Sequence, residues 1–156
     1  MRLALTPSTD PSDYRFVHHI RPRFAETDAM GVIHHGAYVP YLEEARAAML
    51  KHAGHHYNQV REAGIDFAVL ELFIAYRKPL YFDEEVDIYV DAGELTRTTF
   101  QAGYLIQVAG ETRSTAVTVH GAVDSRGRGV RLPSWLAETM ETFPVAPSAC
   151  GAPATE

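Results

Sequence analysis

The stretch from Phe24 to Arg46 reads FAETDAMGVIHHGAYVPYLEEAR and decides the fold. Its first half crowds acids, a glycine and two adjacent histidines ahead of an amphipathic run. From Tyr38 the apolar residues follow the i, i+3, i+4, i+7 spacing of a helix that buries one face. Pro40 is tolerated in a first turn, and Gly54 is a suitable C-terminal stop. The sequence therefore predicts a helix of about four turns that begins at Tyr38.

Strand-like segments surround this helix along the chain. They are rich in β-branched and aromatic residues, or they alternate apolar with polar side chains. After the helix they cover residues 65–76, 84–92, 98–108 and 114–123. Residues 13–24 offer a further strand before the helix, and residues 135–143 a short final helix. The predicted fold class is α+β, with one main helix packed on an antiparallel sheet.

Glu71 interrupts the apolar run of residues 65–76. Strict alternation places its side chain on the same strand face as Phe67, Val69 and Phe73. We expect a rim or edge position for Glu71, and a place at an interface or near a pocket is the alternative.

Composition bounds the classes of function. The chain has 156 residues, with 46% apolar and 22% charged, values typical of one globular domain. Residues 1–13 and 144–156 are rich in Pro, Ser, Ala and Thr, so we expect mobile segments on either side of a domain at 14–143. The net charge of −6 argues against a nucleic-acid partner. We find no membrane-spanning run and no secretory signal, which predicts a cytoplasmic protein.

Other kinds of catalytic site find little support in the sequence. The single cysteine, Cys150, lies in the predicted C-terminal segment, so thiol catalysis is not expected. His52, His55 and His56 form a tempting group, but no cysteine or acid is spaced to complete a zinc site. We explain these histidines by their place at the C-terminus of the helix, where they interact favourably with the helix dipole. No metal is expected. No G-x-S-x-G, G-x-G-x-x-G or Walker pattern occurs.

Asp28 and His35 are the residues most suited to chemistry. The glycine between them permits a tight turn that brings the carboxylate to the start of the helix. Unpaired N–H groups at a helix start suit an oxyanion that forms on an attacked carbonyl. A nearby carboxylate can act as general base toward water or as nucleophile. Capping and turn formation are the commoner roles of such residues, so position alone leaves both alternatives open.

The run from Phe24 to Arg46 resembles the signature of the hotdog-fold acyl-CoA thioesterases of the 4-hydroxybenzoyl-CoA thioesterase type, especially the YbgC-like branch. A second segment, YRKPLYFDEEV from Tyr76 to Val86, is similar to a strand segment of that family. The resemblance covers residues 15 to 140 in element order. It implies a single hotdog domain, in which a curved antiparallel sheet wraps one long helix. It also implies a homo-oligomer, a dimer or tetramer, with active sites where two protomers pair their sheets.

The resemblance also implies roles for individual residues. Asp28 of the T-D-A run is the expected catalytic carboxylate. Backbone N–H groups at His35 and Gly36 are expected to polarise the thioester carbonyl, with help from the His35 imidazole. Residues expected to contact the substrate are Tyr38, Tyr76, Arg77 and Lys78.

Some positions differ from the family pattern, and others are expected to have supporting roles outside catalysis. Ala37 stands where the family commonly has asparagine, and Tyr81 where relatives often carry arginine. Glu43 and Arg46 match the pattern and are expected to form an i, i+3 ion pair. Other cations are candidates for the coenzyme A phosphates, although a solvated surface role is favoured for each; they are Arg97, Arg113, Arg126, Arg128 and Arg131.

The resulting hypothesis is an acyl-CoA thioesterase that cleaves a short-chain or aromatic acyl-CoA to free acid and coenzyme A. Coenzyme A is then part of the substrate, and no cofactor is expected. One alternative is a hotdog enoyl-thioester hydratase or dehydratase with His35 as base. A second is a non-catalytic module that binds an acyl thioester or a protein.

Overall fold

The computed structural model describes residues 5–142. The predicted C-terminal segment 144–156, which includes Cys150, and the first four residues lie outside the described range. Within the predicted N-terminal segment, Pro11–Asp13 forms the 3₁₀ helix η1. The Leu5 amide donates to Gln101 Oε1 at 3.2 Å, so this segment contacts the sheet. The mobility of both segments stays a prediction.

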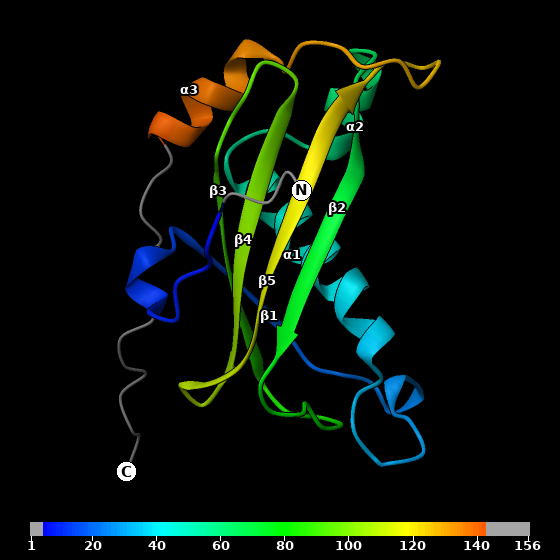
Figure 1. The fold of residues 1–156 in the computed structure, drawn as a ribbon, viewed down its shortest axis with the longest axis vertical. Coiled ribbons are helices and arrows are strands. Elements are labelled where there is room, and N and C mark those ends of the chain that lie inside the picture. The colour runs from blue at the N-terminus through cyan, green and yellow to red at the C-terminus, as the bar shows by residue number, and fades with distance from the viewer. Residues whose placement is uncertain (1–4, 143–156) are drawn as a thin grey trace.

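Five antiparallel strands form one sheet (Figure 1), in the order β1-β3-β4-β5-β2. The strands are β1 Phe16–Ile20, β2 Asp66–Tyr76, β3 Val86–Gly93, β4 Thr99–Val108 and β5 Glu111–Val123. All five predicted strand segments are confirmed. Because β2 pairs with β5, it lies at one edge of the sheet and β1 lies at the other.

The main helix α1, Tyr38–His52, lies across one face of the sheet (Figure 1). Its predicted start is confirmed, and the helix ends just before Gly54, whose φ of +89° suits glycine. The predicted final helix is α3, Ser134–Thr142. The short helix α2, Tyr57–Glu62, was not expected from the sequence.

The core lies between α1 and the sheet. Apolar side chains of the helix pack against alternate residues of the strands, which include Ile88, Tyr104 and Ala116. The alternation predicted for β4 is confirmed, because Phe100, Ala102, Tyr104 and Ile106 are buried on this face. Together these contacts fix the helix against the sheet, and its first turn is thereby fixed near the end of β2.

The other faces of β4 and β5 are buried as well. Glycines leave room there for side chains from elsewhere in the chain: a Cβ at Gly103 would lie 2.8 Å from Leu5 Cδ2. At Gly121 a Cβ would lie 3.0 Å from Leu70 Cδ1. Leu5 and Leu70 therefore cover part of the second face of these strands. The alternation of apolar and polar residues in the sequence does not reveal this packing.

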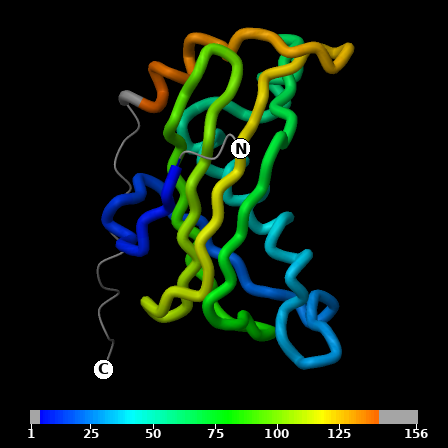
Figure 2. The backbone as a smooth tube through the Cα atoms, in the orientation of Figure 1, coloured from blue at the N-terminus to red at the C-terminus, as the bar shows by residue number. Residues whose placement is uncertain are grey.

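Two connecting segments meet at the N-terminal end of α1. Residues 21–37 lead from β1 into the helix, and residues 77–85 leave β2 (Figure 2). The Ile33 amide donates to the Leu80 carbonyl at 2.8 Å and joins the two segments. Among the described residues, no helix is long and apolar enough to cross a membrane.

Candidate active site

A crevice of about 340 Å³ lies where these two segments meet the start of α1. The structure brings six of the seven predicted site residues to its walls: Asp28, His35, Tyr38, Tyr76, Arg77 and Lys78. They come from two parts of the chain that are about 40 residues apart, so the fold is needed to assemble them.

Asp28 is held in a hydrogen-bonded turn. Its Oδ1 accepts the Met30 N–H at 2.8 Å, and its own N–H donates to the Val32 carbonyl at 2.8 Å. The Gly31 N–H closes the turn on the Asp28 carbonyl at 3.0 Å. The second carboxylate oxygen, Oδ2, has no hydrogen-bond partner within the part of the chain that the structure describes. One oxygen therefore positions the side chain, and the other is available to a ligand or a water molecule.

Gly31 gives a direct test of this turn. Its φ is +76°, and a Cβ there would meet no atom within 4 Å, so strain alone opposes a side chain. We expect Gly31→Ala to lower the free energy of unfolding by about 1–2 kcal/mol. Gly129→Ala is the control, because that position is equally open and has no positive φ. Urea unfolding measures both, and equal values for the two variants would contradict the account.

The residues directly before α1 form the short 3₁₀ helix η3, His35–Ala37. The Gly36 N–H donates to His34 Nδ1 at 3.0 Å, and the two neighbouring histidine rings lie 4.0 Å apart. The His35 N–H has no partner among residues 5–142. Of the two amides predicted to hold the oxyanion, the one at His35 is therefore free in this structure, while the one at Gly36 is used in the turn.

Two tyrosines form an aromatic wall of the crevice. The rings of Tyr38 and Tyr76 are perpendicular, with centroids 5.0 Å apart. The Tyr76 hydroxyl donates to the His35 carbonyl at 3.1 Å and ties β2 to the start of the helix. Burial raises the pKa of both tyrosines, so both hydroxyls are protonated at neutral pH. Tyr76 is 50% exposed and gives the wall a face that a ligand can reach.

Glu26 anchors the segment that carries Asp28. Its carboxylate accepts a short hydrogen bond from the Tyr41 hydroxyl and pairs with Arg23 at 2.6 Å. Its carbonyl accepts the His34 N–H at 2.8 Å. Burial alone would raise the pKa of the Glu26 carboxyl, but the hydrogen bonds from Tyr41 and Arg23 lower it below its ordinary value of 4.5. The segment is thus fixed to α1 by a charge-assisted contact.

Tyr41→Phe is expected to lower the free energy of unfolding by about 2 kcal/mol at pH 7, because a partly buried carboxylate loses its donor. A carboxyl with a lowered pKa stabilises the fold above its ordinary value of 4.5 and loses that stabilisation as the pH falls through its folded-state pKa. The difference between the two proteins should therefore shrink on acidification. Thermal unfolding at pH 7 and in acid measures it, and a difference that does not change with pH would contradict the assignment.

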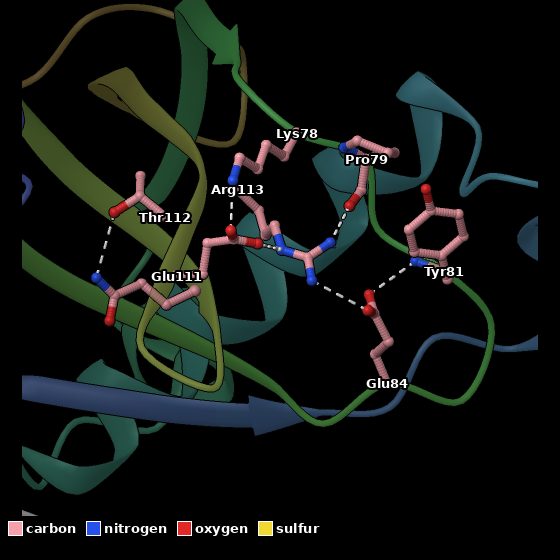
Figure 3. Close-up of polar contacts among 8 residues, drawn as sticks. Lys78, Pro79, Tyr81, Glu84, Glu111, Thr112 and Arg113 are labelled. Carbon is pink, nitrogen blue, oxygen red and sulfur yellow. Dashed lines mark hydrogen bonds and ion pairs between the residues drawn. The ribbon is translucent and has the colours of Figure 1, made fainter.

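The cations near the crevice differ in their partners. Figure 3 shows Arg113 of β5 between Glu84 at 3.1 Å and Glu111 at 3.1 Å, with a short hydrogen bond to the Pro79 carbonyl. Lys78 also pairs with Glu111. Arg113 therefore braces the segment that forms one wall of the crevice.

Arg77 is different, because no acid among the described residues pairs with it. It lines the crevice beside Lys78, whose charge is partly neutralised by Glu111. Arg128 pairs with Asp124 at 2.9 Å, away from the crevice. Arg97, Arg126 and Arg131 are not among the lining residues either. Of the predicted phosphate contacts, Arg77 is therefore the best placed.

Some residues that line or support the crevice were not predicted. Met30, Val32, Ile33 and Pro79 line the crevice with apolar surface. Glu26 and Arg113 hold its walls in place, as described above. A carboxylate at Glu26, directly before the T-D-A run, was the one local signal available for the anchor.

The helix-end histidines occupy separate environments. His55 stacks on Trp135 with ring centroids 3.9 Å apart, and its Nε2 lies 3.1 Å from Thr139 Oγ1. His52 contacts Phe16, and His56 precedes α2. Within residues 5–142, no group of three or more His, Cys, Asp or Glu side chains is arranged to hold a metal ion.

Comparisons with known proteins concern the family and the fold. The model of the thioesterase-like superfamily matches residues 22–140. The crystal structure of a hypothetical protein from Aquifex aeolicus is 33% identical, has a TM-score of 0.77, and aligns over 80% of this chain and 98% of its own. A DHNA-CoA thioesterase from Staphylococcus aureus is 28% identical, with a TM-score of 0.74 over 80% of this chain and 85% of its own. The acyl-CoA thioester hydrolase YbgC of Escherichia coli is 30% identical over 51% of this chain and 60% of its own.

Proposed function

Since this chain belongs to the thioesterase-like superfamily and has its hotdog fold, we propose that it is a thioester hydrolase that cleaves acyl-CoA to a free acid and coenzyme A. The observation that carries the proposal is the pairing, in one crevice, of an unpartnered carboxylate oxygen of Asp28 with the free amide of His35. Hydrolysis of a thioester requires these two groups, a base for the attacking water and a donor to the carbonyl oxygen.

The reaction follows from the two groups. Asp28 Oδ2 takes a proton from a water molecule, and the water oxygen attacks the carbonyl carbon of the thioester. The His35 N–H stabilises the negative charge that develops on the carbonyl oxygen. The carbon–sulfur bond then breaks, and the coenzyme A thiolate leaves and takes up a proton. Direct attack by Asp28, which gives a mixed anhydride that water hydrolyses, uses the same geometry.

The walls of the crevice support a substrate class. Tyr38 and Tyr76 offer aromatic faces, and Met30 and Val32 add apolar surface, which suits an aromatic or short-chain acyl group. Two relatives whose names specify a substrate, a DHNA-CoA thioesterase and a 1,4-dihydroxy-2-naphthoyl-CoA hydrolase, are named for the same aromatic thioester. Arg77 at the wall offers a cation to the coenzyme A phosphates.

Thiol release from a panel of thioesters tests the proposal. The panel contains acetyl, butyryl, hexanoyl, palmitoyl, benzoyl and phenylacetyl coenzyme A, with a thiol-reactive dye as reporter. We expect turnover of benzoyl or short-chain substrates to exceed that of palmitoyl coenzyme A. Addition of water to an enoyl thioester without thiol release would favour the hydratase alternative. Binding without any turnover would favour the non-catalytic module.

We further propose that the protein acts as a homo-oligomer. The edge strand β2 pairs with β5 on one side and carries exposed apolar side chains, among them Val69, Leu72 and Phe73. Such an edge is a natural place for a second copy to add its own sheet. Sedimentation velocity tests this, and a monomer at micromolar concentration would contradict it. A cytoplasmic location stays a prediction.

A further inference from the structure

A second polar cluster lies buried between α1 and the sheet, apart from the crevice. Arg46 of α1 is 3% exposed, and His120 of β5 is 1% exposed. The Thr118 hydroxyl lies 2.7 Å from His120 Nε2 and 3.1 Å from the Tyr104 hydroxyl. A cavity of about 40 Å³ lies beside these four side chains. Polar groups buried this deeply are costly unless each finds a partner.

Two hydrogen bonds join the uncharged members of this cluster. Arg46 can only donate, and its charge near the Tyr104 hydroxyl opposes the rise in that group's pKa that burial causes. The Thr118 hydroxyl lies between the Tyr104 hydroxyl and His120 Nε2, and it can donate to either of them. Burial, together with the nearby Arg46 charge, lowers the pKa of His120 to about 3, so the ring is neutral. Where Thr118 donates to Nε2, the single proton of the ring is on Nδ1.

Buried nitrogen atoms without partners lie around the cavity. Arg46 Nε and Nη1 and His120 Nδ1 are buried and have no hydrogen-bond partner within the described part of the chain. The expected ion pair between Glu43 and Arg46 is wrong, because the ion pairs of residues 5–142 do not include it. Glu43 is exposed to solvent, while Arg46 is buried. A buried guanidinium with free donors calls for an acceptor that carries negative charge.

The cavity lies further along the same junction between α1 and β2 that holds the catalytic crevice. Val39, Val69 and Leu72 are exposed at its walls, and Val39 directly follows Tyr38 of the crevice. From Tyr38 to Arg46 the helix rises about 12 Å. Val39, Val69 and Leu72 offer apolar contacts to an acyl chain that runs from His35 toward the guanidinium.

We propose that this cavity is the distal end of the acyl pocket and that it selects an acyl group with a carboxylate at the end remote from the thioester. The inference rests on the proposed function and deepens it. Arg46 and His120 bind the distal carboxylate, and Val39 and Leu72 contact the chain. Glu43 also lines the cavity, but its side chain is exposed, so solvent screens its charge.

Calorimetric binding to the Asp28→Asn protein tests the proposal without turnover. Suberyl-CoA carries a distal carboxylate, and octanoyl-CoA is the apolar ligand of equal chain length. We expect suberyl-CoA to bind about 10- to 100-fold more tightly than octanoyl-CoA, as for hydrogen bonds to a charged group. Adding Arg46→Met should abolish this preference. Equal affinities for the two ligands, or a preference that survives Arg46→Met, would overturn the proposal.

Matched variants distinguish a carboxylate site at Arg46 from a general effect of losing a positive charge. Arg61→Met removes an exposed arginine that pairs with Asp66 and should keep the preference. If Arg46→Met does not fold, His120→Leu removes the second donor and should weaken the preference. If Arg46→Met changes the oligomeric state and keeps the preference, the guanidinium contacts a second copy of the chain rather than a carboxylate ligand. That result would overturn the proposal. Turnover of octanoyl-CoA by the unmodified protein would still support thioester hydrolysis, so the two proposals fail separately.

Discussion

Asp28→Asn is expected to lower the turnover of the preferred acyl-CoA by about 10²- to 10⁴-fold, the range that general-base catalysis contributes. The amide retains the oxygen that accepts the Met30 N–H, so the turn keeps its hydrogen bond. What the variant loses is the negative charge on the unpartnered oxygen, which takes the proton from water or attacks the carbonyl. Single-turnover thiol release measures the effect directly.

The control for this variant is a carboxylate outside the crevice. Asp87 on β3 pairs with His19 at the surface, 2.7 Å away. Asp87→Asn should change turnover by no more than about twofold. Matching circular dichroism spectra would show that Asp28→Asn is folded. Full turnover by a folded Asp28→Asn protein would remove Asp28 from the mechanism.

Arg113→Met has the second largest expected effect. The guanidinium side chain is 12% exposed and contacts two acids and the Pro79 carbonyl (Figure 3). Its loss leaves these acceptors short of a partner, which should lower the free energy of unfolding by about 2 kcal/mol. Because Pro79 lies in the wall of the crevice, KM for acyl-CoA should rise more than kcat falls. Urea unfolding and steady-state kinetics measure the two effects.

Arg128→Met is the matched control for Arg113→Met. Arg128 pairs with Asp124 four residues away, and its side chain is 69% exposed. An exposed pair of this kind contributes at most about 1 kcal/mol. KM should not change, because Arg128 lies outside the crevice. Equal losses in the two variants would mean that Arg113 is not a brace for the crevice.

Local periodicity explains why so much of the fold was predictable. The spacing from Tyr38 and the stop at Gly54 located α1, and the alternation through Phe100 and Tyr104 located the face of β4 that lies in the core clusters. These signals depend on neighbours within one or two turns or along one strand. The crevice residues were found because the motif from Phe24 to Arg46 and the segment from Tyr76 hold most of them in two short stretches.

Long-range packing explains what the sequence did not predict. A register shift lies between Val69 and Glu71, so Glu71 pairs with Val119 rather than continuing the face of Val69. The predicted shared face of Glu71 with Phe67 and Val69 is therefore wrong, because a bulge inverts the alternation. No periodicity reveals such an extra residue before the partner strand is known.

Side-chain partners were hidden for the same reason. Arg46 was expected to pair with Glu43 on the helix surface, but the residue is buried beside Tyr104, more than fifty positions away in the chain. The use of the Gly36 amide depends on the orientation of the His34 ring, which the sequence does not specify. Arg113 acts on Glu84 and Pro79, which only the pairing of β5 with β2 brings near it.

The most direct test of the central claim is a crystal structure of the Asp28→Asn protein with an acyl-CoA ketone analogue, in which a methylene replaces the thioester sulfur. The account predicts that the ketone oxygen accepts the His35 N–H, that the carbonyl carbon faces position 28, and that a phosphate lies near Arg77. A ketone bound away from the crevice would contradict it, for example in the groove of about 720 Å³ lined by Thr98, Gln101 and Gly121 on the opposite face of the sheet.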